Sequence, residues 1–222
     1  GLLRNPSSVK EILIAPGERL DVLVNFTGNA VGTEIFLISK EFGNGGDAQG
    51  KQQFNIMKFK VASNVTDTFT VPTTLSNITT VSASSAVKTR TFEISNAMEH
   101  HGYPMNDGMQ MRHRINGKLF DSSRIDENVA ANTNELWVFD NSKGDEPHPM
   151  HLHGVFFQVV QRSGGRGNLI ASETGWKDTV LVMPGETVRV IVPFENNTGK
   201  FVFHCHNLEH EDDGMMLQYQ LS

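Results

Sequence analysis

Short stretches in which apolar and polar residues alternate recur along the chain. Successive side chains of a β-strand point to opposite faces, so a period of two predicts strands with one face in a core. Helical periodicity is slight throughout, and glycine and proline separate the alternating stretches. Many short strands with such punctuation are typical of an antiparallel β-sandwich. The expected strands include residues 90–95, 135–139, 154–160, 187–192 and 201–206.

One pattern occurs twice. Residues 16–26 and 184–194 share a Pro, a Gly, a Glu, two valines and a final Phe, 168 residues apart. A repeat at this distance indicates duplicated domains rather than a solenoid. Each copy predicts a Pro-Gly turn and an alternating strand, followed by a second strand at 34–38 or 201–204. The first copy has no His or Cys where the second copy has them.

The two copies differ in the length of chain before them. A β-sandwich of this kind needs on the order of 100 residues, but only fifteen precede the first copy. We expect residues 1–61 to be the C-terminal strands of an incomplete domain and residues 89–222 to be a complete one. Residues 62–88, rich in Ser, Thr, Val and Asn, are the expected linker. The chain is thus expected to be a fragment.

Composition excludes several classes of protein. The chain has 222 residues and a net charge of −6, which argues against a nucleic-acid partner. No apolar run approaches the ~18 residues that a membrane-spanning helix needs. With one cysteine, the chain cannot form an internal disulfide.

That cysteine, Cys205, stands between two histidines in the last expected strand. His204 and His206 are expected to point to one face and Cys205 to the other. His210 and Met215 follow, each after four intervening residues. A thiolate, two imidazoles and a weakly bound thioether form the ligand set of a blue-copper site.

A second histidine run can supply the missing imidazole. His151 and His153 share a face of a short expected strand, and His148 lies just before it. If the two strands are neighbours, one pocket contains His151, His153, His204 and His206, and another contains His148, Cys205, His210 and Met215. The peptide bonds that flank Cys205 would join them. Zinc is an alternative, although seven or more such ligands exceed one tetrahedral zinc. Ordinary core histidines are another alternative.

These two motifs resemble the C-terminal copper motifs of the multicopper oxidases. The resemblance implies that residues 89–222 form a cupredoxin-like Greek-key β-sandwich, and that residues 1–61 end a copper-free middle domain of the same fold. It implies a laccase-like or cuprous oxidase that contains copper and is periplasmic or secreted. Carried over by position, the type 1 copper ligands are His148, Cys205, His210 and Met215, the type 2 ligand is His151, and the type 3 ligands are His153, His204 and His206.

The resemblance also implies partners. The trinuclear cluster of type 2 and type 3 copper needs eight histidines in the family, and this chain provides four. The others would come from the N-terminal domains of the same protein or from a partner chain. The substrates would be O2 and a small reductant, either phenolic or Cu(I). Alone, the chain is expected to bind type 1 copper without reducing O2.

Residues 98–113 are rich in Met and His. Soft thioether ligands select Cu(I), and bacterial cuprous oxidases have a similar segment at this place. Met98, Met105 and Asp107 are therefore candidate ligands for a Cu(I) substrate. The segment is much shorter than in those oxidases, and the methionine that they carry just before the first blue-copper histidine is absent. Methionines that merely fill gaps remain an alternative.

Two carboxylates are candidate catalytic residues. By resemblance, Glu211 would relay protons toward the trinuclear cluster. Asp178 would orient a copper-bound imidazole through its second nitrogen. The alternative for both is a solvated surface carboxylate.

Two other functions remain open. A stand-alone type 1 blue-copper electron carrier would leave four histidines without a role. An inactive copper-binding module is disfavoured because every expected ligand is intact.

Overall fold

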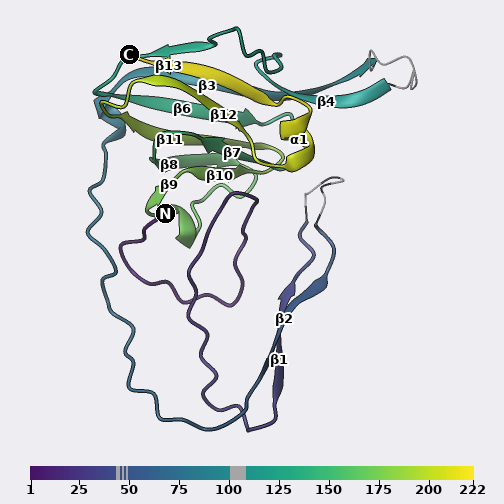
Figure 1. Ribbon diagram of the computed structural model, residues 1–222, viewed down its shortest axis with the longest axis vertical. Helices are drawn as coiled ribbons and strands as arrows, with labels where there is room; N and C mark the ends of the chain where they lie inside the picture. Colours follow the sequence, from purple (N-terminus) through teal and green to yellow (C-terminus); the bar gives the residue numbers. More distant parts are fainter. Residues whose placement is uncertain (44–45, 47, 49, 101–108) are drawn as a thin grey trace.

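The computed structural model describes residues 1–222 except 44, 45, 47, 49 and 101–108, and the described part is largely β-structure. Two sheets pack face to face, and a two-stranded hairpin stands apart from them (Figure 1). The predicted all-β sandwich is confirmed. No helix in the described part is long and apolar enough to span a membrane.

The sandwich consists of a six-stranded and a five-stranded sheet. In spatial order, the six-stranded sheet contains β4 (Met109–Ile115), β3 (Ala86–His100), β6 (Thr133–Asn141), β11 (Glu186–Phe194), β8 (Phe157–Gly164) and β9 (Trp176–Lys177). The five-stranded sheet contains β10 (Thr179–Val182), β7 (His148–Leu152), β12 (Gly199–Cys205), β13 (Met216–Leu221) and β5 (Glu127–Val129). The separate hairpin is β1 (Glu34–Ser39) with β2 (Phe54–Lys60), and the helices are α1 (Leu208–Asp212) and two single 3-10 turns, Ala83–Ser85 and Ala171–Glu173.

Two pairs of strands in the described part of the chain are parallel, although the sequence pattern predicted an antiparallel sandwich. β3 runs parallel to β6, and β13 runs parallel to β5. Hydrophobic alternation reports which face of a strand is buried and not the direction of its neighbour, so sequence periodicity cannot distinguish the two arrangements.

An aromatic cluster joins the two sheets. The ring centroid of Trp137 lies 4.8 Å from that of Phe92 and 5.6 Å from that of Phe194, both in the six-stranded sheet. It lies 5.0 Å from Phe203 and 5.6 Å from Tyr219, both in the five-stranded sheet. All five side chains are almost fully buried. Tilted aromatic contacts at such distances stabilise a core beyond simple area burial.

The sequence repeat corresponds to a repeated turn. Gly17 and Gly185 have φ values of 81° and 76°, a region that glycine adopts without strain. In both copies the following glutamate, Glu18 or Glu186, accepts a hydrogen bond from the backbone N–H three residues earlier at 2.9 Å. The same glutamates pair with buried cations.

The strand predicted after the first turn is not formed. Residues 18–26 are irregular, and Val22, Leu23 and Val24 are more than half exposed. A strand requires a neighbour for its backbone groups, and the described residues place none beside this segment. The second predicted strand of this copy is present as β1.

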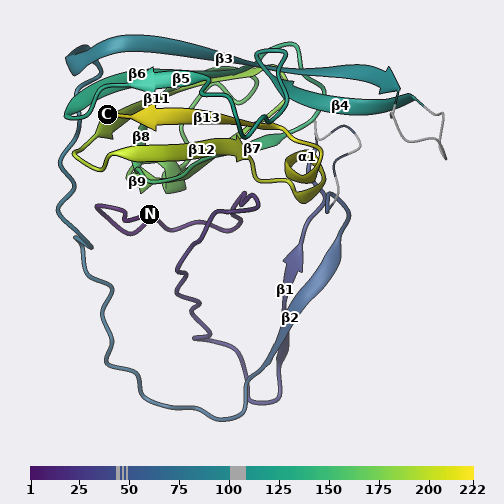
Figure 2. The ribbon, with the colours of Figure 1, turned by 45° about the horizontal axis from the view of Figure 1, so that its top comes forward.

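The expected linker contains little regular structure. Residues 62–82 form no helix or strand and run along one side of the molecule (Figure 2). Its end is tied to the sandwich where the backbone N–H of Val81 donates to Gln158 Oε1 at 2.9 Å. β3 then begins at Ala86.

Replacement of Glu186 by Gln is expected to destabilise the sandwich by about 3 kcal/mol, because fully buried Arg162 would lose one of its two carboxylates. Urea unfolding followed by tryptophan fluorescence measures the change. Glu93→Gln, at a carboxylate that is 56% exposed, is the matched control and should shift stability by under about 0.5 kcal/mol. Equal effects of the two substitutions would contradict a structural role for the buried pair.

The carboxylate of Glu186 is also expected to make the free energy of unfolding depend on pH. Burial by itself would raise the pKa of Glu186, but hydrogen bonds from Arg166 and Met183 and the charge of Arg162 outweigh it and lower the pKa from 4.5 to about 2. The stabilisation is therefore present above pH 4.5 and is lost as the pH falls toward 2. Unfolding curves of the wild type and Glu186→Gln should converge over this interval.

Candidate metal centre

β12 and β7 lie side by side, and their register brings the two histidine motifs together. His204 pairs with His151, and Cys205 pairs with Met150. Immediately after β12, the His206 N–H donates to Pro149 O at 2.7 Å. Because alternate side chains leave opposite faces of β12, the histidines that flank Cys205 and the thiol itself enter different pockets.

The first cluster, which we call the thiol pocket, contains Cys205, His148 and His210. Cys205 Sγ lies 3.6 Å from His148 Nδ1 and 3.5 Å from His210 Nδ1, and these nitrogens are 3.2 Å apart. Met215 is fully buried, and its carbonyl accepts the Cys205 N–H at 3.1 Å. Three soft or borderline donor atoms therefore converge on one point.

The electrostatics of this pocket fit a bound cation. Burial raises the pKa of the Cys205 thiol to about 12, so the thiolate needs a cation beside it. Burial, together with the charge of His113, lowers the pKa of His210 to about 4, and burial lowers that of His148 well below 6.5. Both imidazoles are neutral at pH 7 and offer lone pairs. A thiolate with two neutral imidazoles is a donor set that suits copper.

The second cluster, the imidazole pocket, contains the other four predicted histidines. The rings of His151 and His153 have centroids 4.8 Å apart, and His204 lies 5.4 Å from His206. His153 Nε2 and His204 Nε2 are 3.1 Å apart, so two ligand-type nitrogens face each other. Nitrogens from His151, His153 and His204 all lie within 4.8 Å of one another.

Backbone carbonyls orient two of these rings. His151 Nδ1 lies 2.8 Å from the carbonyl oxygen of Asp178, and His204 Nδ1 lies 2.9 Å from that of Cys205. A carbonyl only accepts, so each Nδ1 carries the proton and each Nε2 keeps a lone pair for the pocket.

The two predicted carboxylates occupy different places. Glu211 Oε2 lies 3.6 Å from His204 Nδ1, the nitrogen that also contacts the Cys205 carbonyl. The carboxylate of Asp178 forms a two-point ion pair with Arg19, and it is the backbone carbonyl of Asp178 that contacts His151. The predicted side-chain contact to an imidazole is thus replaced by a main-chain one.

The sequence motifs assign no role to two residues that contact His210 of the thiol pocket. His113 is buried, and its ring stacks on that of His210 with centroids 3.8 Å apart. Glu146 Oε2 lies 3.2 Å from His210 Nε2 and 3.5 Å from His113 Nε2. His113 lies two residues before the buried Ile115 on β4, so both side chains point to the same face of the strand. This spacing in the sequence could have indicated that His113 points inward.

The methionine-rich segment is described only at its ends. Met98 on β3 pairs in register with Met111 on β4, and both are about half exposed. Met105 and Asp107, the other candidate Cu(I) ligands, lie outside the described residues.

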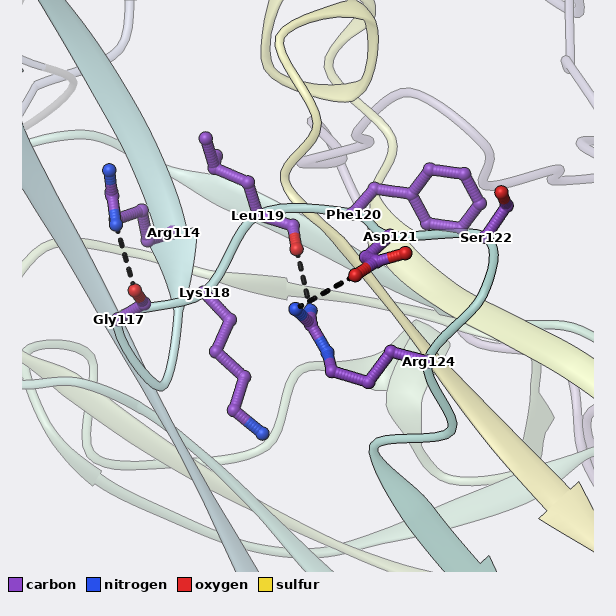
Figure 3. Close-up of a pocket in the computed structure, with 8 residues that line it drawn as sticks. All are labelled: Arg114, Gly117, Lys118, Leu119, Phe120, Asp121, Ser122 and Arg124. Carbon is purple, nitrogen blue, oxygen red and sulfur yellow. Dashed lines mark hydrogen bonds and ion pairs between the residues drawn. The ribbon is translucent and has the colours of Figure 1, made fainter.

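A separate hollow of about 670 Å³ contains none of the predicted ligands that lie within the described residues (Figure 3). Its cations have partners: Arg114 donates to Gly117 O, Arg124 to Leu119 O, and Lys118 lies 3.3 Å from Asp126. The Phe120 N–H at its edge donates to Gly214 O, next to Met215. All three cations that line this hollow are therefore paired within the described part of the chain.

Comparisons with known proteins agree with this geometry. The multicopper oxidase family model matches residues 91–222. A laccase from Haloferax volcanii is 34% identical over 94% of this chain, and the multicopper oxidase mco from Staphylococcus haemolyticus is 32% identical over all of it. The chain covers 34% and 41% of those proteins, respectively.

Solved structures give the same result. The 2F4 variant of the McoA multicopper oxidase from Aquifex aeolicus superposes with a TM-score of 0.85 at 33% identity. The match covers 100% of this chain and 48% of that one. The predicted cupredoxin-like fold is confirmed by this likeness. The chain therefore spans about a third to a half of the proteins it matches.

Replacement of Cys205 by Ser is expected to abolish the intense visible absorption that a copper–thiolate site gives after Cu(II) loading, because the chain has no other thiol. Absorption spectra of copper-loaded wild type and variant provide the measurement, with circular dichroism as the check on folding. Blue absorption that survives in the variant would exclude the thiol pocket as its source.

Replacement of Glu146 by Gln is expected to raise the reduction potential of copper in the thiol pocket by on the order of 50 mV, because a carboxylate near His210 favours the more positive oxidised metal. A redox titration followed by visible absorption measures it. Glu195→Gln, at an exposed carboxylate just after β11, is the control. If both variants keep the wild-type potential, Glu146 does not act on the site.

Proposed function

The chain belongs to the multicopper oxidase family, and on this premise we propose that it is the C-terminal part of an oxidase that couples one-electron oxidation of a reductant to reduction of O2 to water. The observation that carries the proposal is the position of Cys205. Its thiol meets His148 and His210, while its immediate neighbours His204 and His206 belong to the imidazole pocket.

We take the proposed ligands from the family resemblance, and the two pockets support them. Bound copper would supply one-electron chemistry at the thiol pocket and O2 reduction at the imidazole pocket. The type 1 ligands would be His148, Cys205, His210 and Met215, the type 2 ligand His151, and the type 3 ligands His153, His204 and His206. The chain itself provides a covalent connection between the pockets through the peptide bonds on either side of Cys205.

The protein groups around the imidazole pocket have separate tasks in this proposal. Carbonyl contacts hold the Nδ1–H forms of His151 and His204, which keeps their Nε2 atoms available as ligands. Glu211 Oε2 is the proposed site at which a proton from solvent is held, since this side chain is 35% exposed and lies 3.6 Å from His204 Nδ1.

We propose that the remaining imidazoles come from the N-terminal part of a longer polypeptide or from a partner chain. Residues 1–61 would then be the end of a copper-free cupredoxin-like domain, 62–88 a linker and 89–222 the copper-binding domain. The apolar surface of the hairpin supports this organisation, because Phe36, Leu37 and Met57 are each about half exposed. Leu37 and Met57 pair across the hairpin on one face, and Phe36 points to the other. A two-stranded hairpin with apolar side chains exposed on both faces is expected to pack against further structure. A periplasmic or secreted location is proposed with it.

The reductant is proposed to be a small phenol, with Cu(I) as the second candidate. The second candidate is favoured by the paired positions of Met98 and Met111, two soft thioethers exposed on one hairpin. His113 lies two residues beyond Met111 on β4 and stacks on His210, so the hairpin connects this methionine pair with the thiol pocket.

The function is tested by copper content and O2 consumption. The chain alone is expected to show blue copper without O2 consumption, whereas the intact polypeptide should bind four coppers and consume O2. The double variant His151→Ala and His204→Ala in the intact polypeptide should keep blue absorption and lose O2 consumption. A single copper per intact molecule, with no type 2 signal in the EPR spectrum, would instead identify an electron carrier.

A further inference from the structure

The first Pro-Gly turn, residues 15–19, packs directly on the imidazole pocket. A Cβ atom on Gly17 would lie 2.6 Å from His206 Cδ2 and 2.9 Å from His206 Cγ. No side chain fits there, and the backbone of the turn covers the His206 ring. In Figure 1 the N-terminal segment runs beside β9 and β10, and β10 pairs with the histidine-bearing strand β7.

A charged contact joins the same turn to the support of His151. Arg19 Nη1 lies 2.8 Å from Asp178 Oδ1, and Arg19 Nη2 lies 2.7 Å from Asp178 Oδ2. Arg19 Nη1 also donates to Gly17 O at 2.7 Å, so one guanidinium ties its own turn to Asp178. Two parallel charge-assisted hydrogen bonds fix direction as well as distance.

Asp178 and Thr179 provide the two oxygens that contact Nδ1 of His151. The Asp178 carbonyl and Thr179 Oγ1 lie 2.8 Å and 3.0 Å from His151 Nδ1. Thr179 Oγ1 is also 3.4 Å from Gly17 O and 3.3 Å from Asp178 Oδ1. The Thr179 hydroxyl can donate its proton to Gly17 O or to Asp178 Oδ1. In both cases it presents a lone pair to His151 Nδ1, which favours the tautomer with the proton on Nδ1.

A buried ion pair holds the turn in place. Lys177 Nζ lies 2.6 Å from Glu18 Oε1, and the two side chains are 4% and 5% exposed. Glu18 Oε2 accepts the Ala15 N–H, and the Trp176 N–H donates to Leu2 O. The segment that supports His151 is therefore held by the N-terminal region at three successive residues, 176, 177 and 178.

We infer that residues 15–19 form a clamp that positions His151 and His206, with Arg19 as a positioning residue that holds Asp178 and Thr179 against His151 Nδ1. The clamp supplies no ligand of its own, and its role in metal binding rests on the proposed function. The effect of the clamp on the His151 tautomer does not rest on the proposed function, because it is expected in the metal-free chain as well.

The test compares Arg19→Ala, Arg19→Lys and the control Lys40→Ala, which removes an exposed ion pair with Glu11 in the same N-terminal region. Two-bond ¹H–¹⁵N NMR correlations of the metal-free full chain report the tautomer of His151. Arg19→Ala should populate both tautomers, Arg19→Lys should restore part of the Nδ1–H form, and Lys40→Ala should match the wild type. A wild-type tautomer in Arg19→Ala would overturn the inference.

Cu(II) titration gives a second measurement. Arg19→Ala should weaken binding at the imidazole pocket by about 10- to 100-fold, the usual effect of losing an outer hydrogen-bond partner, while the blue absorption of the thiol pocket stays unchanged. Equal weakening at both pockets would indicate general destabilisation and would overturn the inference.

Gly17→Ala tests the contact with His206, and Gly28→Ala is its matched control. Both glycines have positive φ, at 81° and 88°, but a Cβ on Gly28 would meet nothing within 4 Å. Both substitutions carry the same backbone strain, and only Gly17→Ala should shift the His206 ring resonances and weaken Cu(II) at the imidazole pocket. Identical spectra of His206 in the two variants would count against the clamp.

Discussion

The alternation of side chains along β12 is the constraint on which the rest of the structure depends. One strand sends Cys205 toward His148 and His210 and presents its neighbouring imidazoles to a second pocket. This works only if β7 lies beside β12 in a fixed register, because a slip of one residue would exchange the two faces. The aromatic cluster around Trp137 fixes which face of β12 is buried, since Phe203 is one of its members, and Phe203 pairs in turn with buried Leu152 of β7.

The parts of the site that the sequence predicted are those that depend on local geometry. Strand periodicity alone predicts that His204 and Cys205 point to opposite faces of β12. The pairing of His151 with His204 required only that two similar strands be neighbours. His113 and Glu146 were given no role, because their contacts with His210 arise when β4 and the loop before β7 meet in three dimensions. The strand expected after Gly17 failed for a related reason, since periodicity shows that a segment could pair and cannot show that a partner is present.

The repeated turn illustrates how one local structure can serve two purposes. In both copies a glycine with positive φ is followed by a glutamate that binds a backbone N–H and a buried cation. The second copy uses this arrangement inside the sandwich, where Glu186 pairs with Arg162 and Arg166. The first copy uses it at an edge, where Glu18 pairs with Lys177. The turn of the copy without ligands thus has the same local structure and lies against the imidazole pocket of the sandwich.

β3 spans fifteen residues and belongs to two environments. Its first half pairs with β6 in the core, and its second half pairs with β4, which extends beyond the sandwich (Figure 1). Met98 and Met111 therefore sit on an arm whose rotation about its own axis is set by the core. An insertion of one residue between Met111 and Ile115 would turn one of them to the opposite side. Within these paired strands, only insertions or deletions of two residues keep each side chain on its face of the sheet. Substitutions in this arm should therefore be tolerated more easily than changes in its length.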